Sequence, residues 1–233
     1  MSDDALKSKL AEAGCILESE DQGDYCLGHV TLRLPDDPQR FLMKPGAIGL
    51  EEMTPENIIT IDVEGEKVQG TFPRHNEVYI HTEIMRIRPE IVAVVHTHAP
   101  HAVAFSSLGK KLLPVGHGGA MFAEGLPVFS ETTDLIVSQK LGKAVAQCLG
   151  PHQAMLLRNH GIVSAGRTLE EAVWLALTLE KACKLQLLAE AAGGPKLVTP
   201  PDEALRKGRN ISRPENHNNT WNYILRKLVR HRH

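Results

Sequence analysis

The sequence predicts an α/β sandwich, and three observations support this fold class. Apolar residues recur at helical spacing near the start of the chain and again after residue 168. Between these segments, short apolar or β-branched runs bounded by Gly, Pro and Asn predict strands. The strands form a meander and a hairpin and do not alternate regularly with helices, so we expect a mostly antiparallel sheet flanked by helices.

The first elements follow from local patterns. Leu6, Leu10 and their neighbours share one helical face, which predicts a helix over residues 5–17 with Asp3 as its cap and Gly14 near its end. Apolar runs between turn formers then predict strands. They lie within residues 28–35, 40–46 and, as a pair around a tight Glu-Gly turn, 54–70.

The middle of the chain predicts a helix followed by a buried strand. Asn76 can cap a helix that begins at Glu77 and runs until Pro89. The β-branched run "IVAVVHTH", residues 91–98, is typical of a strand that is covered on both faces. Loop residues and a short strand are expected from 118 to 130.

The second half predicts three further elements. An amphipathic pattern over 133–150 indicates a helix capped by a threonine, and "AMLLRNHGIVSAG", residues 154–166, indicates a hairpin. The longest helix should cover 168–192, because Thr168 and Glu171 form a capping box. In the final 195–233 segment, only "TWNYILRKLVR" is expected to be helical.

Composition excludes several classes of function. The 233 residues are 42% hydrophobic and 23% charged, with a formal charge of −2, so neither nucleic acid nor an anionic membrane is an expected partner. No apolar run approaches the roughly 20 residues that span a bilayer. Four scattered cysteines without CxxC spacing favour a cytoplasmic protein.

Histidines at the end of the buried strand are the most informative feature. His96 and His98 are two residues apart, so on a strand both side chains project from one face and can converge on one divalent ion. His160, in the apolar "LLRNHGIV" hairpin, is the best third ligand. Taken alone, the His-x-His pair is more often only polar residues at a strand end. His101 and His117 are expected to be ordinary loop histidines.

A carboxylate precedes this strand on the helix. Glu77 could simply favour the positive helix end, and His81, four residues on, could pair with it on the helix surface. Alone, neither position indicates function.

Together, "PRHNEVYIHTEIMRIRPEIVAVVHTHAPHAVAFS" and "LLRNHGIVSAGRTLEEAVWLALTLEKAC" resemble the class II aldolase/adducin family. The similarity covers about residues 5 to 192. It implies a three-layer α/β/α sandwich with a central, mostly antiparallel sheet, a catalytic domain over 1–194 and a C-terminal extension over 195–233. It also implies that His96, His98 and His160 bind one divalent metal ion per subunit, and that Glu77 is the acid/base.

Departures from the family pattern bear on the substrate. Sugar-phosphate members carry G-N-x-S and T-x-S-G elements that cradle a phosphate. Here the first place reads Gly28-His29 and the second reads Lys44-Pro45-Gly46, and a proline has no amide donor. His29 and Lys44 are therefore candidate substrate-binding residues of another kind.

Before the glutamate, "PRHNE" replaces the small residues usual in aldolases. Arg74 and His75 could grip a carboxylate beside the metal, or could belong to a solvated turn. These substitutions resemble the decarboxylase branch, whose substrates include hydroxylated aromatic or heteroaromatic carboxylic acids.

The resemblance therefore implies a metal-dependent carbon–carbon lyase, with a decarboxylase favoured. An aldolase acting on a hydroxy-carbonyl or sugar-phosphate compound, a retro-aldol epimerase and a non-catalytic adducin-like interaction domain stay as alternatives. Imidazole ligands suit several ions, so Zn or Mn is expected, with Fe possible.

Family members are commonly homotetramers, which is the expected assembly here. In the C-terminal extension, Tyr223 is a further candidate substrate-binding residue, because this segment could cover the pocket of a neighbouring subunit. The plainer interpretation is a helix packed on its own domain.

Overall fold

The computed structural model describes residues 2–231 of the protein, and within them the chain forms eight helices and eight strands. The helices are α1 Asp3–Ser19, α2 Val78–Ile87, α3 Pro100–Ser106, α4 Gly116–Met121, α5 Gln139–Leu149, α6 Leu169–Ala191, α7 Pro201–Ile211 and α8 Pro214–His231. The strands are β1 His29–Arg33, β2 Arg40–Met43, β3 Ile59–Asp62, β4 Lys67–Gln69, β5 Ala93–Thr97, β6 Val128–Phe129, β7 Ala154–Leu157 and β8 Gly161–Gly166.

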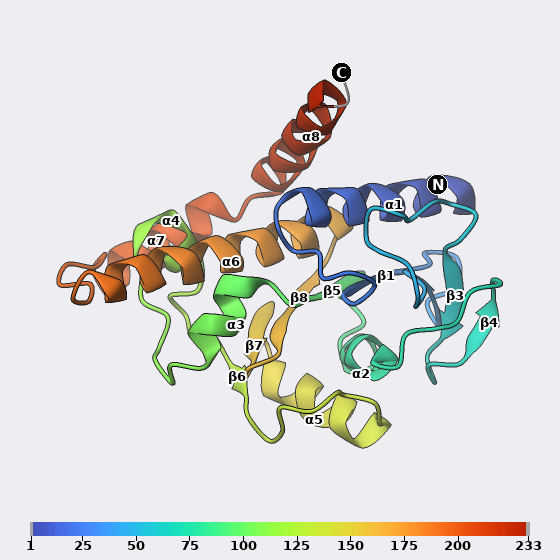
Figure 1. The fold of residues 1–233 in the computed structure, drawn as a ribbon, viewed down its shortest axis with the longest axis horizontal. Coiled ribbons are helices and arrows are strands. Elements are labelled where there is room, and N and C mark those ends of the chain that lie inside the picture. Colours follow the sequence, from blue (N-terminus) through green and yellow to red (C-terminus); the bar gives the residue numbers. More distant parts are fainter. Residues whose placement is uncertain (1, 232–233) are drawn as a thin grey trace.

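The strands form one sheet in the order β4-β3-β2-β1-β5-β8-β7-β6. Every neighbouring pair is antiparallel except β6 and β7, which are parallel. Figure 1 shows three layers, with α1, α6 and α8 on one side of the sheet and α2 and α5 on the other. The expected α/β/α sandwich with a mostly antiparallel sheet is confirmed.

Alternation along the two central strands determines which residues face α2. On β5, Val95 packs under α1 and α6, whereas Val94 packs under α2 and α5. Because side chains two apart share a face, His96 also points to the α2 side. On the neighbouring β1, His29 lies directly opposite His96, so both imidazoles share the α2 side of the sheet.

The long, strongly patterned elements agree with the sequence expectations. The hairpin β7–β8 and helix α6 occur where expected, and the side chain of Thr168 caps α6 by accepting the amide of Glu171. In α1, however, the cap is Ser2, and Gly14 lies inside the helix, where a Cβ would come within 2.3 Å of the Leu50 carbonyl oxygen. Gly14 therefore allows close packing and does not end the helix.

Several shorter helices differ from the expectations. Helices α3, α4 and α7 occupy segments expected to be irregular, α5 begins at Gln139 with Ser138 as its cap, and α2 has Glu77 at its N-cap with no side-chain cap bond. Tertiary contacts explain α3, because the buried carboxylate of Glu180 on α6 accepts the amides of His101 and Ala102 in its first turn. A local sequence pattern cannot show such a partner.

The C-terminal helices pack on the domain: α7 contacts α4, and α8 contacts α1 and α6. Trp221 and Ile224 of α8 join the core that α1 and α6 form with the sheet. Among residues 2–231, the helices are all too short or too polar to cross a membrane.

Candidate metal centre

Four side chains that are distant in sequence converge at one end of the central strands. One ligand atom from each of Glu77, His96, His98 and His160 lies within 4.8 Å of the others. His96 ends up fully buried, and Glu77 is 3% exposed. The structure thus brings together all four residues to which the sequence assigned the metal and the proton chemistry; these roles themselves stay predictions.

His96 on β5 and His98 just after it direct their imidazoles at the same point, and each ring is oriented by a hydrogen bond to its other nitrogen. His96 Nδ1 lies 2.9 Å from the carbonyl oxygen of Ile162 on β8. His98 Nδ1 lies 2.8 Å from a carboxylate oxygen of Asp24. Because both partners only accept hydrogen bonds, each Nδ1 carries the proton and each Nε2 presents a lone pair to the cluster.

His160 reaches the cluster through a tight turn between β7 and β8. Asn159 has a φ of 56°, in the left-handed region, which reverses the chain just before His160. At Gly161, a Cβ would come within 2.3 Å of the Thr97 carbonyl oxygen, so only glycine lets β8 approach β5 this closely. The Asn-His-Gly sequence therefore serves both the turn and the contact between the strands.

Glu77 enters from the start of α2. Its Oε1 accepts the amide of Ile136 at 2.8 Å and lies 3.6 Å from His160 Nε2, while its Oε2 lies 3.9 Å from His96 Nε2. Burial favours protonation of this carboxyl, but the neighbouring imidazoles of His160, His29 and His96 outweigh it and lower the pKa of Glu77 below its ordinary value. Glu77 is therefore ionised at neutral pH.

The donor set fits a divalent cation. The Nε2 atoms of His96, His98 and His160 are all buried without a hydrogen-bond partner. Burial also lowers the pKa of His96 well below its ordinary value, which keeps this imidazole neutral. Unpaired buried lone pairs are costly unless a ligand satisfies them, and three imidazoles with a carboxylate match the chemistry of Zn, Fe or Mn.

A second chain of buried groups lies behind Glu77. His29 Nδ1 is 2.5 Å from His81 Nε2, and His81 Nδ1 is 2.8 Å from the hydroxyl of Thr31. The Thr31 hydroxyl donates to the Val94 carbonyl, so it accepts from His81, which in turn accepts the proton of His29. This order leaves His29 Nε2 as a lone pair that faces Glu77 Oε2 at 3.9 Å.

The position of His81 corrects a sequence expectation. A surface pair with Glu77 was expected, but His81 is fully buried, and burial lowers its pKa to about 3. Helix α2 packs directly on the sheet, so His81, four residues after Glu77, points inward to His29 and Thr31 of β1.

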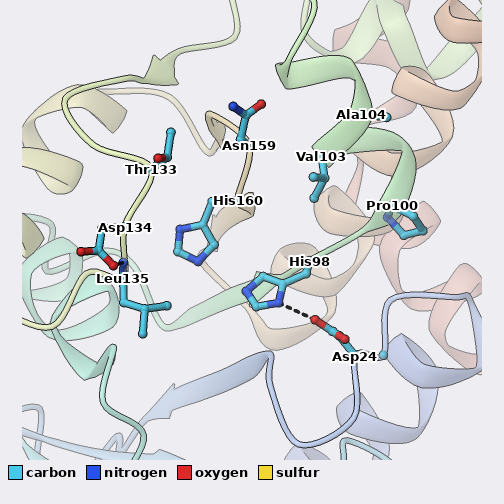
Figure 2. A pocket seen from close by; sticks show the side chains of 11 residues that line it. Asp24, His98, Pro100, Val103, Ala104, Thr133, Asp134, Leu135, Asn159 and His160 are labelled. Carbon is cyan, nitrogen blue, oxygen red and sulfur yellow. Dashed lines mark hydrogen bonds and ion pairs between the residues drawn. The ribbon is translucent and has the colours of Figure 1, made fainter.

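An open pocket of about 690 Å³ gives access to the cluster through His98 and His160. Figure 2 shows Pro100 and Val103 of α3 on one side of these rings and the Thr133–Leu135 loop on the other. The sequence predicted a helix over this loop, but α5 begins only at Gln139. The irregular segment before it contains Ile136, whose amide donates to Glu77.

The candidate substrate-binding residues occupy different environments. Lys44 is fully buried, and its ammonium donates to the carbonyls of Cys26 and Pro45; burial lowers its pKa to about 8. Tyr223 is 53% exposed on α8, in the layer away from α2.

Two further candidates precede Glu77. The ring of His75 lies 4.1 Å from that of His29, and its pKa is lowered to about 4, first by burial and then by the charge of Lys44. His75 is thus uncharged at neutral pH. Arg74 is half-buried, with its guanidinium 5.9 Å from the ring of Tyr79. Binding of substrate by these residues, by His29 and by Tyr223 stays a prediction.

Sequence reasoning missed the groups that support the cluster, namely Asp24, Thr31 and the Ile136 amide. Their positions depend on long-range contacts, and no local motif marks them. The lesser histidine candidates lie apart: His101 pairs with Glu180, and His117 lies on α4.

Comparisons with known proteins agree with this architecture. Residues 8–187 match the family model of the class II aldolase and adducin N-terminal domain. The decarboxylase NovR of Streptomyces niveus is 35% identical over 190 residues, which cover 81% of this chain and 70% of that protein. The 3,4-dihydroxyphthalate decarboxylase of Arthrobacter keyseri is 28% identical, covering 95% and 93% of the two chains.

Among solved structures, the L-fuculose 1-phosphate aldolase from Glaciozyma antarctica PI12 superposes with a TM-score of 0.85. Its sequence is 27% identical, and the match covers 97% of this chain and 90% of that one. These relatives are lyases, and the cluster described above is one that could hold a metal ion. From its sequence match and its fold, this chain belongs to the class II aldolase and adducin family.

Proposed function

We propose that the protein is a divalent-metal-dependent decarboxylase of a hydroxylated aromatic or heteroaromatic carboxylic acid. The convergence of Glu77 with three unpartnered imidazole nitrogens is the observation that carries this proposal. Similarity to two decarboxylases supports the reaction type. The ligands would be His96, His98 and His160, and the ion Zn or Mn, with Fe possible.

When bound, a divalent cation would supply Lewis-acid stabilisation of negative charge on the substrate oxygens. The chain's own residues prepare this chemistry. Three neutral imidazoles would leave the double positive charge of the ion undiminished, which a carboxylate ligand would partly cancel. The apolar wall formed by Pro100, Val103 and Leu135 suits the face of an aromatic ring.

In this proposal, Glu77 moves the proton. It is ionised at neutral pH, so it first accepts a proton from a substrate hydroxyl. When the bond to the carboxylate carbon breaks and CO₂ leaves, the electron pair stays on the ring carbon, and Glu77 returns the proton to that carbon. The Ile136 amide holds Oε1 throughout, and the lone pair of His29 lies opposite Oε2, where it can accept a hydrogen bond from a substrate hydroxyl.

The segment Lys44–Gly46 argues against a phosphorylated substrate. The ammonium of Lys44 already donates to two carbonyls. Pro45 has no amide hydrogen, and the amides of Lys44 and Gly46 donate to the carbonyls of Val30 and Pro73, respectively. A phosphate arriving here would find each of these donors in use.

An aldolase is the second candidate, because the similarity to the L-fuculose 1-phosphate aldolase covers nearly the whole chain. In that reaction Glu77 would remove a hydroxyl proton before the carbon–carbon bond breaks. An epimerase acting by retro-aldol cleavage would use the same residues.

The deciding experiment measures two products from one panel of substrates. Purified protein loaded with Zn²⁺ or Mn²⁺ is given dihydroxybenzoates, phthalates and pyridine carboxylates, and both CO₂ and aldehyde release are followed. We expect CO₂ release that stops when a chelator removes the metal. Aldehyde release from hydroxy-carbonyl compounds, with no CO₂ from any acid, would replace the decarboxylase by the aldolase.

A non-catalytic adducin-like domain makes a separate, simple prediction. Such a domain has no need of the ion, so the wild-type protein and His96→Ala would contain equally little metal after purification without added ions. We expect the wild type to retain metal and the variant to lose it.

We also propose that residues 1–194 form the catalytic domain of a cytoplasmic homotetramer and that residues 195–233 extend over a neighbouring site. Two observations support a role for Tyr223 in another subunit. Its side chain is exposed, and α8 lies on the side of the sheet opposite to α2, which carries Glu77 at its N-cap. Deleting residues 210–233 should sharply lower turnover by the tetramer. Unchanged turnover would mean that α8 only packs on its own domain.

A further inference from the structure

The segment 22–27, which joins α1 to β1, is held by one contact to the candidate metal centre and by two contacts to other buried residues. Gln22 Oε1 accepts the hydroxyl of Thr97 at 2.7 Å, with both side chains buried. Asp24 accepts the Nδ1 proton of His98, and the Cys26 carbonyl accepts the Lys44 ammonium at 2.9 Å. Two of these contacts fall on consecutive residues, 97 and 98, at the end of β5.

The contact with Asp24 determines what His98 can do. An ionised carboxylate has no proton to donate, so His98 must carry its proton on Nδ1. Its Nε2 is then a lone pair, and this atom is buried without a partner in the cluster. A charged acceptor also makes a stronger hydrogen bond than a carbonyl and raises the basicity of the opposite ring nitrogen.

We propose that Asp24 is the positioning residue of the metal centre, fixing the orientation and the tautomer of His98 so that Nε2 is available to the ion. Gln22 and Lys44 hold the segment that carries it. This inference rests on the proposed metal centre, because its purpose is to present His98 to a cation. Figure 2 shows the carboxylate beside His98 at the pocket wall, where Asp24 is part-exposed.

The contacts of the two strand histidines show why a positioning group is needed here. His96 is held inside the sheet by the Ile162 carbonyl, but His98 follows the last residue of β5 and its side chain is 15% exposed. Without Asp24, that ring could rotate or shift its proton to Nε2, and either change would remove the lone pair from the cluster.

The test compares Asp24→Asn and Asp24→Ala with the wild type in the full-length protein. Asn keeps a neutral acceptor and Ala removes it, so the dissociation constant for Zn²⁺, measured by competition with a chromophoric chelator, should rise in the order Asp, Asn, Ala. We expect Ala to weaken binding by about 10- to 100-fold, the usual effect of removing the partner of a ligating histidine. Asp21→Asn, an exposed carboxylate three residues away, is the matched control and should change it less than about twofold.

A second measurement reports on the histidine itself, without metal. Nitrogen-15 NMR of the metal-free protein should show His98 with its proton on Nδ1 in the wild type and a mixture of tautomers in Asp24→Ala, with the resonance assigned by its loss in His98→Gln. Equal Zn²⁺ affinities of wild type and Asp24→Ala, or an unchanged His98 tautomer, would overturn the proposal.

These outcomes separate from failure of the proposed function. If no acid yields CO₂ but Asp24→Ala weakens Zn²⁺ binding, only the substrate assignment fails. If the wild type binds no metal, the metal-dependent function fails, and the tautomer measurement still decides whether Asp24 orients His98.

Discussion

Two walls enclose the candidate metal centre, and they are built differently. The strand wall consists of β1, β5 and β8, where His29 and His96 are fully buried and are held by groups inside the sheet and α2. The loop wall consists of Gln22–Leu27 and Thr133–Ile136, which contribute Asp24 and the amide that holds Glu77. The strand wall determines the positions of the buried histidines, and the loop wall supplies the hydrogen-bond partners of His98 and Glu77.

The comparison predicts that the strand wall tolerates change least. His96→Ala should abolish metal binding, weakening it by more than about a hundredfold, because it removes a ligand and not merely a supporting partner. Metal content after dialysis measures this. His117→Ala, an exposed histidine on α4, should keep the wild-type content, and a metal-replete His96→Ala protein would show that the centre lies elsewhere.

Glu77 lies between the two walls, with one carboxylate oxygen on the Ile136 amide and the other 3.9 Å from His96 Nε2. Its replacement should separate proton transfer from metal binding. In Glu77→Gln the side-chain oxygen can still accept the Ile136 amide, but the group no longer carries a proton to the ring carbon. We expect turnover to fall by about 10²- to 10⁴-fold with the metal retained. Glu83→Gln, a buried carboxylate on the same helix that pairs with Arg86, is the control. Wild-type turnover in Glu77→Gln would remove it from the mechanism.

Thr31 tests the interior of the strand wall. Thr31→Val preserves the shape but leaves the Nδ1 proton of His81 without its acceptor in a fully buried place. An unsatisfied buried donor costs about 1–3 kcal/mol, so the free energy of unfolding should drop by that amount in denaturant titrations. Turnover should fall too, because His29 loses its fixed tautomer. Thr60→Val on β3 is the matched strand control, and equal losses in the two variants would argue against the chain of hydrogen bonds.

The same two walls explain what the sequence could and could not predict. The His-x-His spacing at the end of β5, the Asn-His-Gly turn and the capping box of α6 are local patterns, and the structure has each of them where the sequence predicted it. Asp24 lies 74 residues from His98, and the Ile136 amide lies 59 residues from Glu77. Such contacts arise only when the loops pack, so composition and periodicity cannot reveal them. The expectation of a surface position for His81 was wrong for the same reason, because His81 lies on α2 and its partner His29 lies on β1.

The last effect concerns the pH dependence of Lys44, whose ammonium contacts the loop wall at the Cys26 carbonyl. Burial lowers the pKa of Lys44 from its ordinary value of 10.5 to about 8, so between these values the folded protein binds fewer protons than the unfolded chain. The cost of the buried charge is therefore fully present below pH 8 and is relieved as the pH rises toward 10.5. We therefore compare the free energy of unfolding of the wild type with that of Lys44→Met, which lacks the ammonium. As the pH rises through this window, the wild-type value should increase relative to that of the variant by at most about 1.4 kcal/mol per pH unit. Parallel pH profiles of the two proteins would show that Lys44 is not charged and buried as the contacts with Cys26 and Pro45 require.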